Sequence, residues 1–315
     1  MAGFFGLFDF TKPGKGVDKD APRLHPFFLF WALYWRKFSR LVLINFIYFV
    51  LLLPIIFIIY LTFNELLGFF ELLPEISADT ESGVVGIPGM LVIAILSGIY
   101  GSPVFLVLLL ASAILYGPAT CGFTYILRNY SREEHAWLSD FWSRAKSNFR
   151  QGLAIGLLEI AAFYVFVMNI TLSGAGSPGG VMDWLLLVSR VLSVALFVIF
   201  LFMRHYLYLM VVTFDLKVSH IIKNAFFFAF IGLPKNVLCV VVELLICLAL
   251  LATAGLFGGI IELVLSAFFL LSLGGFACVS LCYPVIRKYM LKDEPPDGSP
   301  PDEPPGEAPP EGVSA

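Results

Sequence analysis

Residues 41–63 read LVLINFIYFVLLLPIIFIIYLTF, an apolar run that follows a basic cluster at residues 36–40. A helix needs about 20 apolar residues to cross the hydrocarbon core of a bilayer, so this run predicts a transmembrane helix. Residues 41–127 contain no Lys or Arg at all. Basic residues flank membrane helices on the cytoplasmic side, so this gap predicts that the acidic loop at 64–102 lies on the outer face.

The composition of the whole chain agrees with a membrane protein. Hydrophobic residues make up 59% of the chain and charged residues 14%, whereas soluble proteins average about 25% charged residues. The net charge of −3 hides an asymmetry, because the basic residues gather near the expected cytoplasmic side. A nucleic-acid-binding face would need a concentrated basic patch, and the sequence predicts none. The lipid bilayer is therefore the expected environment.

The fold class that follows is an all-α polytopic membrane protein with about six transmembrane helices and with both termini in the cytoplasm. Basic residues flank alternate ends of the spans, which supports an even number of them. A cytoplasmic segment at 1–36 precedes a membrane domain at 37–292, and an acidic, proline-rich tail at 293–315 is expected to be disordered. Leu91–Gly101 is too short for a span and is expected to be re-entrant or interfacial. The predicted spans are 41–63, 103–127, 152–172, 184–206, 237–254 and 260–286.

Two of the expected cytoplasmic segments have the pattern of amphipathic surface helices. Ser131-Arg-Glu-Glu134 matches a capping box, which predicts a helix that begins at Ser131. The apolar residues that follow fall at helical spacing, so the helix is expected to lie on the inner membrane surface. The segment 219–234 has a similar pattern, which suggests an internal repeat of surface helix and span. The residues predicted to face a partner are Trp137, Phe141, Trp142 and Arg144.

Among the ionisable residues inside the predicted spans, Glu159, Arg190 and Glu243 are singled out. A charge in the membrane interior is costly, so such residues are candidates for function. One interpretation is a buried cluster that lines a path for a solute or a proton. The alternative is an ion pair that fixes the packing of the helices, or glutamates that face a wet crevice.

The sequence predicts no catalytic site, no cofactor and no metal site. The five cysteines, Cys121, Cys239, Cys247, Cys278 and Cys282, all fall inside spans and are expected to pack as small apolar residues. The four histidines are scattered, and none has the spacing of a zinc motif. A hydrolytic enzyme needs an acid, a base and a nucleophile or metal, and no such set is visible. The expectation is a protein that is not an enzyme.

Several short motifs give the chain a family resemblance. They are Gly3-Phe-Phe-Gly-Leu-Phe-Asp9, Gly117-Pro-Ala119, Tyr125-Ile-Leu-Arg-Asn-Tyr130 and Ile222-Lys-Asn-Ala225. With these motifs the chain resembles the YesL family of bacterial membrane proteins, which is defined by a domain of unknown function. The resemblance implies a location in the bacterial cytoplasmic membrane and an accessory or regulatory part in carbohydrate uptake. It supplies no catalytic residues.

Two functions follow as hypotheses. The first is a non-catalytic accessory protein that contacts a transporter subunit or a sensor kinase through its surface helices. The second is a small-solute permease that uses Arg190 with Glu159 and Glu243. The first is favoured, because the resemblance implies it, while the second depends on whether the three charges meet.

Overall fold

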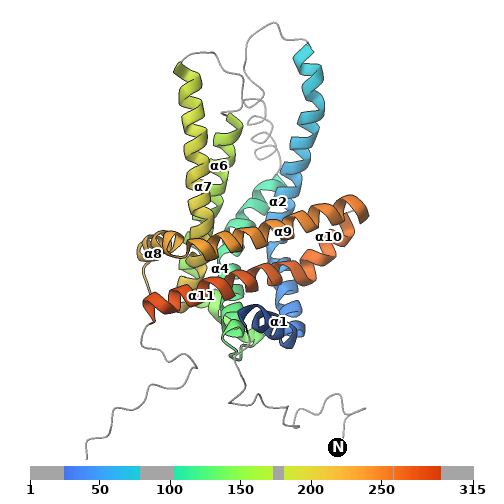
Figure 1. Cartoon of the computed structure of the whole chain (residues 1–315). Helices are drawn as coiled ribbons and strands as arrows, with labels where there is room; N and C mark the ends of the chain where they lie inside the picture. The colour runs from blue at the N-terminus through green and yellow to red at the C-terminus, as the bar shows by residue number, and fades with distance from the viewer. Residues whose placement is uncertain (1–24, 79–102, 173–180, 258, 292–315) are drawn as a thin grey trace, which may run out of the picture.

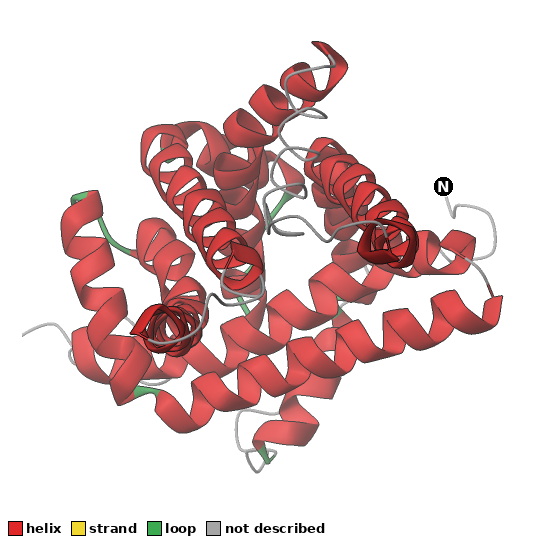
Figure 2. Cartoon of the chain, turned by 90° about the horizontal axis from the view of Figure 1, so that it is seen from above, coloured by secondary structure: helices red, strands yellow, loops and turns green. Residues whose placement is uncertain are grey.

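The computed structural model of the protein describes residues 25–78, 103–172, 181–257 and 259–291. Within these ranges every regular element is a helix and no strand occurs (Figures 1 and 2). The predicted re-entrant segment Leu91–Gly101 and the predicted disordered tail lie outside the described residues. The helices are α1 (Pro26–Arg36), α2 (Phe38–Ala78), α4 (Pro103–Ser131), α5 (Leu138–Ser147), α6 (Phe149–Leu172), α7 (Val181–Thr213), α8 (Val218–Ile231), α9 (Leu233–Phe257), α10 (Gly259–Leu265), the π-helix Ser266–Leu270 and α11 (Leu271–Met290).

Six helical segments are long and apolar enough to cross a membrane. They are Phe38–Ile59, Pro103–Ser131, Phe149–Phe166, Leu187–Thr213, Leu233–Thr253 and Ile261–Met290. This confirms the predicted all-α class and the number of candidate spans. The cytoplasmic placement of the two termini stays a prediction.

Several helix boundaries differ from the sequence-based expectation, and two of them change the interpretation of a segment. Helix α2 continues to Ala78, so part of the expected acidic outer loop is helical. Ser131 ends α4 instead of beginning a surface helix. Its hydroxyl donates to the carbonyl of Arg128 at 2.7 Å, and Glu133 then takes a positive φ of 63°, which turns the chain out of the helix. The surface helix α5 begins only at Leu138.

Tight packing is concentrated at one end of the bundle. On α7, Tyr206 and Leu207 are completely buried. Nearer the start of the same helix, Val191 and Leu192 are 62% and 56% exposed. Figure 1 shows the far ends of α2, α6 and α7 projecting away from the packed end, where α1, α8 and α11 lie. Exposed aliphatic side chains on long helices are suited to contact with lipid.

Helices α9, α10 and α11 run across α2, α6 and α7 instead of parallel to them (Figure 1). The π-helix between α10 and α11 is fixed to α2 by one side chain. The Asn45 side-chain amide donates to the carbonyls of Ser266 at 2.8 Å and Ala267 at 2.7 Å, and its oxygen accepts from the backbone N–H of Ser272. A π-helix leaves backbone groups without their usual helical partners, so these bonds satisfy groups that would otherwise be buried without one.

Helices α4 and α6 cross so closely that their backbone atoms are in contact. A Cβ atom added at Gly117 would lie 1.9 Å from the carbonyl oxygen of Gly152, and one added at Gly156 would lie 2.9 Å from the Cα of Gly117. Small residues at such crossings allow membrane helices to approach closely. The two helices cross in opposite directions, so Tyr116 of α4 lies beside Gly156 of α6, one helical turn before Glu159.

Candidate functional site

The two glutamates predicted inside the spans meet at one arginine. Glu159 on α6 lies 2.9 Å from Arg204 on α7, measured between Glu159 Oε1 and Arg204 Nε. Glu243 on α9 approaches the other side of the guanidinium, with 3.9 Å between Glu243 Oε1 and the terminal nitrogen of Arg204. All three residues lie inside candidate spans. The cluster predicted from the sequence therefore forms around Arg204.

Arg190 is not the residue at the centre of this cluster. It precedes Arg204 by fourteen positions on the same helix, which is about 21 Å at a rise of about 1.5 Å per residue. The expectation that Arg190 reaches both glutamates is corrected accordingly. Arg204 lies near the end of the predicted fourth span, 184–206, and was not singled out from the sequence. In the structure the apolar segment continues to Thr213. The signal in the sequence that could have identified Arg204 is a single arginine followed by a further apolar run.

Glu159 is held on both of its oxygens. One receives Arg204, and the Tyr208 hydroxyl donates to the other at 2.9 Å. Glu159 as a residue is 8% exposed, so its charge depends on these partners. Moving a carboxylate from water into the membrane interior costs less free energy when it is paired with a cation than when it is alone. Glu159 therefore helps to fix the position of the Arg204 guanidinium.

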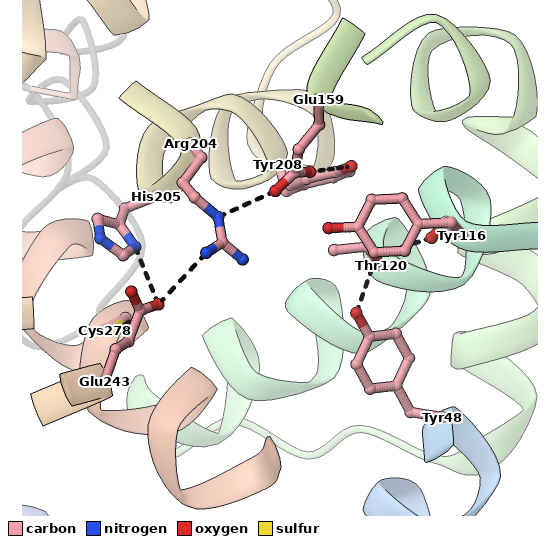
Figure 3. A network of polar contacts seen from close by, with 9 residues as sticks. All are labelled: Tyr48, Tyr116, Thr120, Glu159, Arg204, His205, Tyr208, Glu243 and Cys278. Atoms are coloured by element: carbon pink, nitrogen blue, oxygen red, sulfur yellow. Dashed lines mark hydrogen bonds and ion pairs between the residues drawn. The ribbon is translucent and has the colours of Figure 1, made fainter. Parts of the chain in front are cut away.

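Tyr48 of α2 and Thr120 of α4 form a second polar surface, which faces Arg204 (Figure 3). The Thr120 hydroxyl donates to the carbonyl of Tyr116 at 2.7 Å. Tyr48 lies 3.0 Å from Thr120 between the two hydroxyl oxygens. The single Thr120 proton is already used, so Tyr48 is the donor in this second bond. The Tyr48 ring is fixed by stacking on Phe123, with 4.1 Å between ring centroids.

Between these two surfaces lies a cavity of about 380 Å³. Its polar lining includes Tyr48, Thr120, Arg204 and Glu243, and apolar side chains from α4, α9 and α11 complete it. Glu159 does not line the cavity and reaches it only through its contact with Arg204. Small-ligand sites in proteins have volumes of roughly 300–1,000 Å³ and combine apolar walls with a few oriented polar groups. The volume and the mixed lining of this cavity are therefore those of a small-ligand site.

One corner of the cavity brings together residues that the sequence did not connect. His205 follows Arg204 on α7 and approaches Cys239 of α9 and Cys278 of α11. From the sequence, these cysteines were expected to pack as small apolar residues, and no metal site was predicted. The three residues come from three different helices, so no local spacing motif links them.

The basic cluster at residues 36–40 packs on the loop between α4 and α5. Arg36 forms a 2.7 Å ion pair with Glu133, and the Arg40 guanidinium lies 5.2 Å from the centre of the Trp137 ring. Burial, followed by repulsion from Arg40 and Arg36, lowers the pKa of Lys37. Trp137 remains 63% exposed, so its outer face is accessible, as predicted for a residue that meets a partner.

The other predicted contact residues on α5 divide between core and surface. Phe141 is completely buried and packs on Gly122 of α4, which corrects the prediction that it faces a partner. Trp142 is 42% exposed. Arg144 lies over the ring of Tyr125, 4.6 Å from its centre, so part of its role is to attach α5 to α4.

Comparison with known proteins gives one match. Residues 91–170 match the model of a family described as "Protein of unknown function, DUF624", and the resemblance to the YesL family agrees with this match. The matched segment contains α4, α5 and most of α6, with Thr120 and Glu159. It ends before α7 and α9, which carry Arg204 and Glu243. Neither the curated proteins nor the solved structures give a match. The chain therefore contains a domain of unknown function within a multi-pass membrane protein.

Proposed function

We propose that the protein binds a small, neutral, hydroxyl-rich solute in the cavity beside Arg204. The observation that carries this proposal is the Arg204 guanidinium, placed between two glutamates and facing hydroxyl groups across a cavity of about 380 Å³. A structural ion pair needs no cavity beside it. Here the paired charges border open space, so they are available to a ligand as well as to each other.

The charges of the site favour a particular class of solute. Two carboxylates surround one guanidinium, so an anionic solute would meet an excess of negative charge in a medium of low dielectric constant. A hydroxylated neutral solute avoids this cost. It would accept hydrogen bonds from Arg204 and donate to Glu243, while an aromatic ring such as that of Tyr48 packs on its apolar face. Sugars have this combination, which agrees with the link to carbohydrate uptake that the family resemblance implies.

Two roles are compatible with solute binding. In the first, the protein is an accessory or regulatory component that binds the solute and contacts a transporter subunit or sensor kinase. The observation that favours it is the exposure of Trp137 and Trp142 at the packed end of the molecule. In the second, the protein is itself a permease. The bacterial cytoplasmic membrane is the proposed location for either role, and neither requires catalysis.

The test is direct binding to the full-length protein in lipid nanodiscs. We would measure affinity for glucose, for the anion gluconate and for the cation glucosamine. We expect the neutral sugar to bind more tightly than the anion. Tyr48→Phe keeps the ring but removes the hydroxyl oxygen, which can still accept a hydrogen bond from a solute hydroxyl. It should weaken binding by roughly two- to tenfold, since a neutral hydrogen bond contributes about 0.5–1.5 kcal/mol. The matched control is Tyr289→Phe, because Tyr289 is 47% exposed and does not line the cavity.

The outcome that would contradict the proposal is absence of binding for the whole panel, or equal loss in the Tyr289→Phe control. Reconstitution in liposomes then separates the two roles. Net flux of the bound solute would identify a permease. Binding without flux would favour the accessory role, and crosslinking from native membranes would identify the partner.

A further inference from the structure

Three metal-ligating side chains converge at the corner of the cavity where α7, α9 and α11 meet. They are His205, Cys239 and Cys278, whose potential ligand atoms all lie within 4.8 Å of one another. Cys239 is completely buried, Cys278 is 7% exposed, and the His205 side chain is 5% exposed. Two cysteines and a histidine in contact form a donor set that favours thiophilic metals.

The hydrogen bonding of His205 is incomplete among the described residues. Its Nε2 atom is buried and has no hydrogen-bond partner there. Its Nδ1 atom lies 3.9 Å from Glu243 Oε1, which is beyond hydrogen-bonding distance. Burying a polar nitrogen without a partner is costly, and each such group calls for an explanation, an unseen ion being one of the usual ones. A metal ion ligated by Nε2 would satisfy this atom while Nδ1 faces Glu243, so the histidine is a second, independent indication that a ligand belongs at this corner.

Glu243 lies at the edge of this group. Its Oε1 atom is 3.9 Å from His205 Nδ1 and 3.9 Å from Cys278 Sγ. We propose that His205, Cys239 and Cys278 bind one thiophilic metal ion, with Zn²⁺ a good fit because thiolates and imidazole are its usual protein ligands. In a tetrahedral zinc site with Zn–S bonds of about 2.3 Å, two sulfur ligands lie about 3.8 Å apart. The ligand atoms of the three residues, which lie within 4.8 Å of one another, therefore need to approach by about 1 Å.

The charge balance favours such a site in a membrane. Zinc binds thiolates, so Cys239 and Cys278 each release a proton when the ion enters. The added Zn²⁺ and the two new thiolate charges sum to zero, so the net charge of the neighbouring Glu159, Arg204 and Glu243 cluster is unchanged. The occupied site therefore places no additional net charge in the membrane interior, which is where such a charge would be most costly.

The competing interpretation is that these cysteines only pack. Cys239 Sγ also lies 3.6 Å from Cys282 Sγ, so a pair of buried thiols in mutual contact would account for these two residues. It does not account for His205, which is on another helix. Nor does it explain why a histidine and a carboxylate from α7 and α9 face the same sulfur atom.

The experiment measures metal content of the full-length protein, purified in mild detergent under reducing conditions. The protein is incubated with Zn²⁺ or Cu⁺, freed of excess metal and analysed by inductively coupled plasma mass spectrometry. We expect about one ion per chain. Cys239→Ser, Cys278→Ser and His205→Asn should each weaken binding by at least about tenfold, since even changes outside the ligand set cost 10–100-fold. Cys247→Ser is the matched control, because Cys247 is an exposed thiol on the same helix as Cys239.

A second measurement guards against variants that only misfold. Co²⁺ in place of Zn²⁺ gives sulfur-to-metal charge-transfer absorption in the wild type, which shows thiolate ligation without any substitution. Size-exclusion elution reports whether each variant is folded. The proposal is overturned if reduced wild-type protein retains neither Zn²⁺ nor Cu⁺, or if Cys247→Ser loses as much metal as the other variants. The two sites share the neighbourhood of Glu243, but metal content is measured without sugar and sugar affinity without added metal, so either proposal can fail alone.

Discussion

Replacing Arg204 by glutamine tests the centre of the cluster most directly. The change leaves the buried Glu159 carboxylate without the guanidinium that lies 2.9 Å away. At this distance the attraction is about 6 kcal/mol for an effective dielectric constant of about 20, before desolvation is subtracted. Removing one partner of a buried ion pair costs about 3–5 kcal/mol in practice. The Arg204 side chain is 36% exposed, so we expect the lower value, a loss of about 3 kcal/mol of unfolding free energy.

The magnitude is best tested with a double-mutant cycle. Glu159→Gln alone should cost less than Arg204→Gln, because Arg204 then keeps Glu243 as a partner. The double substitution Glu159→Gln/Arg204→Gln should cost about as much as Arg204→Gln alone. This gives a coupling energy of at least about 1 kcal/mol, in the range found for residues in contact. The assay is equilibrium unfolding in mixed micelles, followed by far-ultraviolet circular dichroism.

A parallel cycle with Arg190 supplies the control. Arg190 is on the same helix but about 21 Å from Arg204, so Glu159→Gln and Arg190→Gln should be additive within about 0.5 kcal/mol. The reasoning fails if Glu159 and Arg204 are additive within that margin, or if Glu159 couples to Arg190 instead. The second result would restore the arrangement that the sequence alone predicted.

Three further predictions follow from contacts elsewhere in the fold. Asn45→Leu removes three hydrogen bonds to the π-helix region and should lower the unfolding free energy by about 2 kcal/mol, at about 0.6 kcal/mol per bond in a membrane protein. Gly117→Ala places a Cβ 1.9 Å from a backbone carbonyl of α6 and should lower the unfolding free energy by about 3 kcal/mol or more. Its control is Gly259→Ala, where nothing lies within 4 Å of the new atom. The control should elute as wild type in size exclusion. Replacing Trp137 and Trp142 together by alanine should cost about 1–2 kcal/mol in stability, since one cation–π contact with Arg40 and one edge-to-face contact with Phe141 are lost. The same change should abolish crosslinking to any partner that binds the surface helix. Unchanged crosslinking would exclude this surface.

The sequence predicted the fold class well because membrane helices follow from run length and charge alone. It failed where the answer depends on three-dimensional position. Ser131 has the residues of a capping box, but its hydroxyl bonds to the carbonyl of Arg128 behind it, and the sequence pattern cannot tell the end of one helix from the start of the next. Phe141 has the helical spacing of a surface contact, but only the packed structure shows that its face meets Gly122.

The candidate site was predicted in part for the same reason. Glu159 and Glu243 stand out because each is a lone charge in an apolar run, and this property is visible in one dimension. Arg204 and His205 were missed because their significance comes from neighbours on α6, α9 and α11. Pairwise proximity between distant helices cannot be read from the composition of either helix.

The contact between Gly117 and Gly152 limits how α4 and α6 can move. Because the two helices touch through their backbones, no side chain between them can change its rotamer to absorb a shift, and a tilt of α4 is expected to carry α6 with it. Any change in the width of the proposed solute cavity would then come from α7, α9 or α11. The ion pair between Arg204 and Glu159 joins α7 to α6 and would oppose the separation of these two helices.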